Sequence, residues 1–163
     1  MDVREATTDD VEGVRTVARR SWKADYPTIL SRESIGKGLE EWYAPERLRF
    51  DAGSDDALLL IAADGEAVAG FAHAVIDESE DVGTLLRLYV DPDHRERGLG
   101  TRLLDEVRER LDEYGCSRLE AMVLERNEPG NAFYRSYGFE RDRVGATTID
   151  GDPHDEVVYA LTW

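Results

Sequence analysis

The sequence contains a single cysteine and no long hydrophobic segment. Because Cys116 stands alone, the chain cannot form an internal disulfide bond, and no cluster of cysteine and histidine offers ligands for zinc. No apolar run approaches the roughly 20 residues that a membrane-spanning helix requires. The first residues, Met1–Glu5, have neither the basic nor the apolar region of an export signal. These absences predict a cytoplasmic protein that uses no metal, carries out no redox chemistry and binds no membrane.

Lysine is also scarce, whereas acidic residues are abundant. The chain has 36 Asp and Glu against 20 Lys and Arg, which gives a net charge of −16, and only Lys23 and Lys37 are lysines. Such a surface repels a phosphate backbone, so we expect no nucleic-acid partner. An acidic surface poor in lysine is typical of proteins that work in concentrated salt, where the Debye length is only about 3 Å near 1 M. We therefore expect a halophilic protein, with an acidic protein from an arginine-rich proteome at ordinary salt as the alternative.

The length and the apolar pattern predict one mixed α/β domain that covers residues 1–163. A chain of 163 residues with 41% hydrophobic residues is long enough for one core. Leu103, Leu104, Val107 and Leu111 form an apolar stripe at helical spacing, and Asp64-Gly65 favours a hairpin turn. The expected strands are 3–6, 57–63, 66–77, 83–90, 117–124, 139–149 and 154–161, and the expected helices are 11–26, 29–43, 100–114 and 129–137. This order of elements indicates an α/β fold.

A glycine-containing segment, Arg95–Thr101, lies between an expected strand and the longest expected helix. The N-terminus of a helix exposes unpaired amides and the positive end of the helix dipole, so this segment predicts an anion-binding loop. A phosphate-binding Walker A loop requires a lysine that is missing from Gly100-Thr101-Arg102. A dinucleotide-binding fingerprint requires a third glycine where Leu103 stands. The remaining alternative is that the glycines serve only a turn and a helix start.

Arg95, Gly98 and Gly100 match the Arg/Gln-x-x-Gly-x-Gly/Ala signature within residues 88–104. Asn127 is followed seven residues later by Tyr134, and then by Gly138-Phe139. These two landmarks resemble those of the GNAT N-acetyltransferases, and the resemblance is strong over residues 83–140. It implies a mostly antiparallel sheet that is splayed between its fourth and fifth strands, with acetyl-CoA bound in the gap.

The resemblance also implies which residues bind acetyl-CoA. The backbone amides from Arg95 to Thr101 would hold its phosphates, and the backbone of the fourth strand would pair with its pantetheine arm. Asn127 would hydrogen-bond the cofactor, although it could equally cap the helix that opens at Pro129. The expected cofactor-binding residues are therefore Leu88, Tyr89, Val90, Arg95, Glu96, Arg97, Gly98, Leu99, Gly100, Thr101 and Asn127.

Tyr134 matches the tyrosine that in this family protonates the departing thiolate, and its alternative role is that of a packed aromatic side chain. In some members of this family a glutamate five residues before the asparagine landmark acts as the general base, but this chain has Met122 at that position. Glu120, on the same strand face, and His73 are the candidate bases, although a lone histidine in an apolar strand is more often a core residue. A partly deprotonated amine or a chain of waters would need no base.

The resemblance predicts an acetyl-CoA-dependent N-acetyltransferase in which a primary amine attacks the thioester directly within a ternary complex. The acceptor is expected to be a small-molecule amine or a protein amine, and a homodimer built on the terminal strands would suit the fold. Because a methionine replaces the glutamate, a non-catalytic acyl-CoA-binding or regulatory module is the alternative. Four aromatic residues either frame the acceptor site or belong to the core: Trp22, Tyr26, Trp42 and Tyr43.

Overall fold

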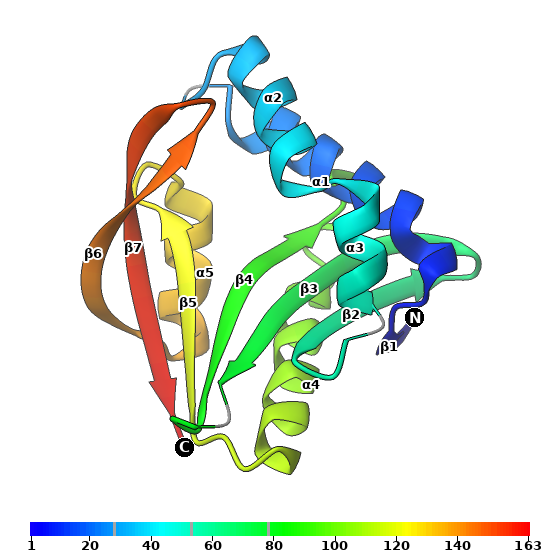
Figure 1. Ribbon diagram of the computed structural model, residues 1–163, viewed down its shortest axis with the longest axis vertical. Helices are drawn as coiled ribbons and strands as arrows, with labels where there is room; N and C mark the ends of the chain where they lie inside the picture. The colour runs from blue at the N-terminus through cyan, green and yellow to red at the C-terminus, as the bar shows by residue number, and fades with distance from the viewer. Residues whose placement is uncertain (28, 53, 78) are drawn as a thin grey trace.

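The computed structural model describes residues 1–27, 29–52, 54–77 and 79–163. Its strands form one seven-stranded sheet in the order β1-β2-β3-β4-β5-β7-β6 (Figure 1). Neighbouring strands run antiparallel except β4 and β5, which are parallel. The strands are β1 (Asp2–Glu5), β2 (Ala57–Asp64), β3 (Ala67–Asp77), β4 (Val82–Val90), β5 (Arg118–Leu124), β6 (Glu140–Ile149) and β7 (Asp152–Thr162). The helices are α1 (Val11–Asp25), α2 (Arg32–Trp42), α3 (Pro45–Ala52), α4 (Leu99–Glu113) and α5 (Glu128–Tyr137). The expected mixed α/β fold is confirmed.

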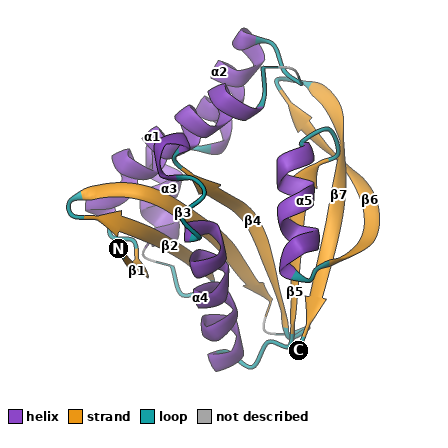
Figure 2. Ribbon diagram, turned by 180° about the vertical axis from the view of Figure 1, so that it is seen from behind, coloured by secondary structure: helices purple, strands orange, loops and turns teal. Residues whose placement is uncertain are grey.

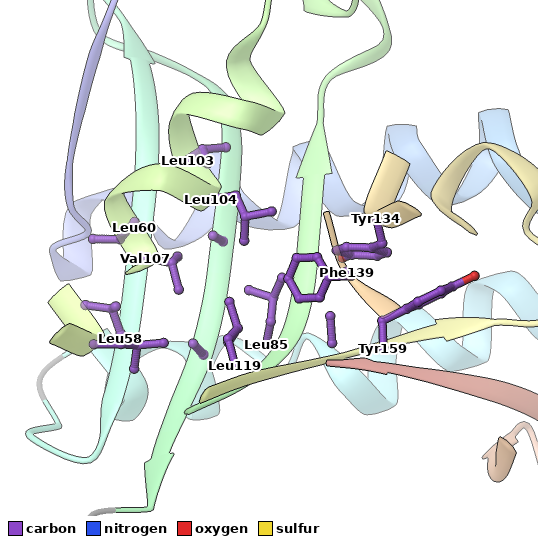
Figure 3. Close-up of a cluster of buried hydrophobic side chains, with 14 of the residues drawn as sticks. Leu58, Leu60, Leu85, Leu103, Leu104, Val107, Leu119, Tyr134, Phe139 and Tyr159 are labelled. Atoms are coloured by element: carbon purple, nitrogen blue, oxygen red, sulfur yellow. The ribbon is translucent and has the colours of Figure 1, made fainter. Parts of the chain in front are cut away.

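Helices cover both faces of the sheet. Helices α4 and α5 lie on one face, and α1, α2 and α3 lie on the other (Figure 2). The predicted apolar stripe of α4 packs on the first face, where Leu104 and Val107 meet sheet residues such as Leu85 (Figure 3). On the second face, Val14 and Trp22 of α1 belong to a separate buried cluster. Within the described residues, no helix is long and apolar enough to cross a membrane.

Helix α3 was not expected from the sequence, where Pro45 is interpreted as the end of the preceding helical stretch. The structure places Pro45 at the start of α3 instead. The first turn of a helix has no hydrogen-bond partner for its amides, so a proline there loses nothing. Leu48 of α3 is buried against the same core as α1. Proline in this sequence therefore separates two helices and also begins the second.

Strands β4 and β5 pair over only part of their length. Their register joins Val82–Leu85 to Arg118–Ala121, and the strands diverge beyond those residues (Figure 1). On the other side of β4, His73 of β3 is opposite Arg87 while Ala74 is opposite Leu85, so Leu86 is the extra residue of a β-bulge. A bulge bends its strand and increases its twist, which turns the end of β4 away from β5. The expected splay between these strands is confirmed.

Candidate active site

A cleft of about 410 Å³ opens between the diverging ends of β4 and β5. One wall consists of β4 from Leu86 onward and the loop that leads into α4. The opposite wall consists of β5 from Met122 onward, the start of α5 and Glu156 of β7. All the expected cofactor-binding residues except Arg97 line this cleft, and Tyr134 lines it as well. The structure thus brings together two landmarks that are about 30 residues apart in the chain.

The loop before α4 presents backbone amides to the cleft. Glu96 and Gly98 have left-handed backbone conformations, with φ of 63° and 76°. Gly98 caps α4 without a side-chain hydrogen bond, so the first amides of the helix have no intrahelical acceptor. A Cβ atom at Gly100 would lie only 3.2 Å from the ring of Phe133, so the ring would have to shift to accommodate a larger residue at this position. The local geometry therefore suits an anionic group on these amides.

The side chain of Arg95 is already occupied. Its guanidinium forms two hydrogen bonds with the carboxylate of Asp25, at 2.7 and 2.9 Å, and its Nε donates to the carbonyl of Val90 at 3.1 Å. The bidentate pair with Asp25 joins the loop to the end of α1, and the hydrogen bond to Val90 joins it to the end of β4. Arg95 is thus placed to position the loop, and three N–H groups of its guanidinium are engaged by the protein itself.

Tyr134 is both a packed aromatic residue and part of the cleft. Its ring lies 5.3 Å from that of Phe139 and 5.9 Å from that of Tyr159 (Figure 3). Burial raises the pKa of Tyr134 above the ordinary range of a phenol, so the hydroxyl group keeps its proton at neutral pH. Among the described residues, no protein group hydrogen-bonds this hydroxyl. The hydroxyl is therefore free to donate to a group bound in the cleft.

Two asparagines fix the turn between β5 and α5. The side-chain oxygen of Asn127 accepts a hydrogen bond from the amide of Gly130 at 3.2 Å, so the expected capping role is confirmed. Asn131, which sequence reasoning missed, is buried and donates to the carbonyls of Asn127 and Leu124 at 2.7 and 3.1 Å. Its side-chain oxygen accepts a hydrogen bond from the hydroxyl of Tyr159. This network holds the start of α5, and with it Tyr134, against the sheet.

The two candidate bases from the sequence do not line the cleft. Glu120 shares a strand face with Met122, as expected, but its carboxylate pairs with Arg143 at 2.9 Å. His73 is almost fully buried, and its Nδ1 accepts a hydrogen bond from Arg87 at 2.9 Å. Burial, together with the charges of Arg87 and Arg47, lowers the pKa of His73 to about 4. Neither side chain lines the cleft, so the geometry does not favour either group as the base, and both assignments stay predictions.

The four aromatic candidates divide between the core and the cleft. Trp22 and Tyr43 are fully buried in the core between α1 and the sheet, and they do not line the cleft. Tyr26 and Trp42 do line it, and the hydroxyl groups of Tyr26 and Tyr89 share a hydrogen bond at 2.9 Å. Trp22 packs against both cleft residues, with ring centroids 5.0 and 5.3 Å away. The core residues thus hold the cleft residues in place.

Sequence reasoning missed two charged residues of the cleft. Arg87 lines it, with its guanidinium carbon 4.9 Å from the centre of the Tyr43 ring. Glu156 lines it from β7, where it lies opposite Leu124 of β5. The sequence carries no signal for Glu156, because its position depends on how β7 pairs with β5.

Comparison with known proteins gives consistent matches. The model of the acetyltransferase (GNAT) family matches residues 14–139. Spermidine N(1)-acetyltransferase of Thermoplasma acidophilum is 30% identical over 144 residues, which cover 86% of this chain and 88% of that protein. The crystal structure of PaiA N-acetyltransferase from Thermoplasma acidophilum, in complex with coenzyme A, matches with a TM-score of 0.88 at 28% identity and covers 99% of this chain and 98% of that one.

A third relative shares the fold. Ribosomal-protein-S18-alanine N-acetyltransferase from Escherichia coli matches with a TM-score of 0.74 at 20% identity, covering 99% of this chain and 92% of that chain. Its low identity supports the fold alone. The family resemblance drawn from the two landmarks is confirmed by these matches.

Proposed function

The chain belongs to the acetyltransferase (GNAT) family and is an acyltransferase, and from this premise we propose that it transfers the acetyl group of acetyl-CoA to a primary amine within a ternary complex. The observation that carries the proposal is the cleft itself. Helix amides without an intrahelical acceptor lie at one wall of the cleft, and Tyr134, whose hydroxyl has no partner among the described residues, lies at the other. A relative at 28% identity has its structure determined with coenzyme A, which supports acyl-CoA binding here.

Acetyl-CoA would be held mainly by backbone groups. The amides of Leu99, Gly100 and Thr101 would bind its phosphates, because short directional hydrogen bonds remain effective on a chain with net charge −16. Beyond Leu85, the edge of β4 that faces β5 has no strand partner, so it can pair with the amides of an extended pantetheine arm. Backbone amides near Leu88 to Val90 would stabilise the oxyanion that forms on the thioester carbonyl.

Tyr134 would act as the general acid. When the tetrahedral intermediate collapses and the C–S bond breaks, the phenol would give its proton to the sulfur. The raised pKa of Tyr134 keeps that proton available at neutral pH. The amine would reach the thioester from the side lined by Tyr26 and Trp42. A small cationic amine suits this acidic protein, as it suits the spermidine-acetylating relative.

The first experiment is a calorimetric titration of acetyl-CoA into the folded protein in multimolar KCl, followed by thiol release with spermidine, a lysine peptide and a peptide with a free N-terminus. We expect micromolar binding, and release of one thiol per acetylated amine with at least one of these acceptors. A folded protein that binds no acetyl-CoA would overturn the proposal.

Two glycines provide a matched pair of variants. Gly98 in the loop before α4 and Gly151 in the β6–β7 turn have φ of 76° and 78°, and a Cβ atom on either would meet nothing within 4 Å. Alanine costs about 1–2 kcal/mol of backbone strain at each. We expect Gly98→Ala to weaken acetyl-CoA binding by about tenfold and Gly151→Ala to leave it unchanged. Equal loss in both variants would mean that the loop has no direct part in binding.

A further inference from the structure

Glu156 is a half-buried carboxylate that lines the cleft and has no side-chain partner among the described residues. Its burial is intermediate, and it forms no ion pair or hydrogen bond with another side chain among the described residues. In contrast, Asp25 at the same cleft is paired with Arg95, and Glu120 on the same sheet face is paired with Arg143. Removing a carboxylate from water costs free energy that an ion pair or a ligand normally offsets. The position of Glu156 is therefore unexplained by the structure alone.

The register of β7 places Glu156 near Met122, the position where the resemblance to the GNAT family implies a glutamate that acts as the base in some relatives. Met122 of β5 is opposite Val158, and Leu124 is opposite Glu156, so Glu156 and Met122 lie on the same face of the sheet. Both residues line the cleft. The opposite face of these strands carries Val157 and packs with Tyr134 in the core. A carboxylate and a phenol thus reach the cleft from opposite faces of the sheet.

Resting on the proposed acetyl transfer, we propose that Glu156 is the general base that takes a proton from the acceptor amine. The carboxylate accepts one proton from the ammonium group, and the freed lone pair forms the C–N bond with the thioester carbonyl. Collapse then breaks the C–S bond, and Tyr134 gives its proton to the sulfur. The second proton on the new amide nitrogen returns to the Tyr134 oxygen through water, and Glu156 releases its proton to solvent, so one proton is produced for each acetyl group transferred.

The surroundings of Glu156 support this role. The facing residues on β5, Met122 and Leu124, cannot ionise, and burial raises the pKa of Glu156, which makes its carboxylate a stronger base. Arg143 on β6 is paired with Glu120 and Asp142. The other titratable groups that line the cleft with Glu156 are Tyr134 on α5, which shares its wall, and Arg87, Tyr89, Tyr26, Asp25, His94, Arg95 and Glu96; His154 lies on its own strand.

The test compares Glu156→Gln with Asp155→Asn, which removes the same charge from the neighbouring exposed residue of β7. We expect Glu156→Gln to lower kcat at pH 7 by about 10²-fold or more, with acetyl-CoA affinity unchanged. The variant's kcat should rise with pH up to the pKa of the amine, about tenfold per unit, whereas the wild-type kcat levels off at lower pH. Asp155→Asn should keep the wild-type kcat and pH profile.

A third variant separates proton transfer from shape. Glu156→Asp keeps the ionisable group but shortens the side chain, so it should retain more activity than the nearly isosteric Glu156→Gln, together with the wild-type shape of the pH profile. An active wild type whose Glu156→Gln variant keeps kcat and pH profile would overturn the inference. A rise in KM alone would also overturn it, because it would assign Glu156 to binding of the ammonium group. A wild type that binds acetyl-CoA but acetylates no amine would overturn the proposed function as well.

Discussion

Tyr134 and Tyr159 are neighbouring buried tyrosines whose hydroxyl groups have different surroundings. The Tyr134 hydroxyl lines the cleft without a protein partner among the described residues, whereas the Tyr159 hydroxyl donates to Asn131 at 2.7 Å. We expect Tyr134→Phe to lower kcat by about 10²-fold or more without changing acetyl-CoA affinity or the free energy of unfolding. Steady-state kinetics and urea denaturation measure these quantities.

The control variant Tyr159→Phe should show the converse effect. It leaves the buried side-chain oxygen of Asn131 without its donor, which costs about 1–3 kcal/mol of unfolding free energy. Its kcat should fall less than that of Tyr134→Phe. If Tyr134→Phe kept full turnover at saturating substrates, the phenol would not be the proton donor.

His73 gives the protein a predictable sensitivity to acid. Asp51 lies 3.2 Å from its Nε2 and favours the charged ring, but burial and two arginines outweigh this effect and lower the pKa of His73 to about 4. In the unfolded chain His73 titrates near its ordinary pKa of 6.5. The stability that its lowered pKa gives the folded protein is therefore fully present above about pH 6.5 and is lost as the pH falls towards 4. We expect the unfolding free energy in urea to fall over this window, with a smaller slope in His73→Gln. Identical slopes would show that other groups govern the acid sensitivity.

Only some residues of the candidate site could be predicted from the sequence. The landmarks located Tyr134, Asn127 and the loop before α4, because each sits in a short motif with a local geometric role. Glu156 carries no such motif, since its place in the cleft arises from the pairing of β7 with β5. The ion pair of Arg95 with Asp25 could not be predicted from the sequence either, because the two residues lie 70 positions apart.

The loop before α4 depends on α1 for its shape. The bidentate contact between Asp25 and Arg95 joins the end of α1 to the start of this loop. We expect Asp25→Asn to weaken acetyl-CoA binding by about tenfold, or about 1.4 kcal/mol, because the loop must then be ordered during binding. Calorimetric titration measures the change, and Glu12→Gln, which removes an exposed carboxylate from the same helix, is the matched control.

The same titration distinguishes positioning from direct binding. If Asp25 only withheld Arg95 from a phosphate, Asp25→Asn would free the guanidinium and acetyl-CoA affinity would rise. A rise would therefore contradict the positioning role.

At the scale of elements, alternation and helical periodicity predicted most of the strands and helices. The hairpin at Asp64-Gly65 formed as expected, with φ of 63° at Gly65. Helix α3 was missed because Pro45 both ends one helical stretch and suits the first turn of the next. The bulge at Leu86 was also missed, because an extra residue in one strand is defined only by the register of its partner.

For the whole molecule, order along the chain did not determine order in the sheet. Strand β7 lies between β5 and β6, so the last strand of the chain forms part of the cleft while β6 is left at the edge.

The expected homodimer on the terminal strands, the cytoplasmic location and the halophilic character all stay predictions. Sequence composition supports the last of these directly, because net charge is a property of the whole surface.

The net charge of −16 predicts that salt stabilises the whole molecule. Compaction brings like charges together, and the Debye length falls from about 10 Å at 0.1 M to about 3 Å at 1 M, so most of the repulsion should be screened within that range. We expect Tm to rise by about 5–10 °C between about 0.1 and 1 M KCl, with a smaller gain above 1 M. Sucrose at matched osmolality is the control, because it is excluded from protein surfaces but screens no charge. If sucrose raised Tm as much as KCl, exclusion rather than charge would explain the effect, and a Tm independent of KCl would favour a protein adapted to ordinary salt.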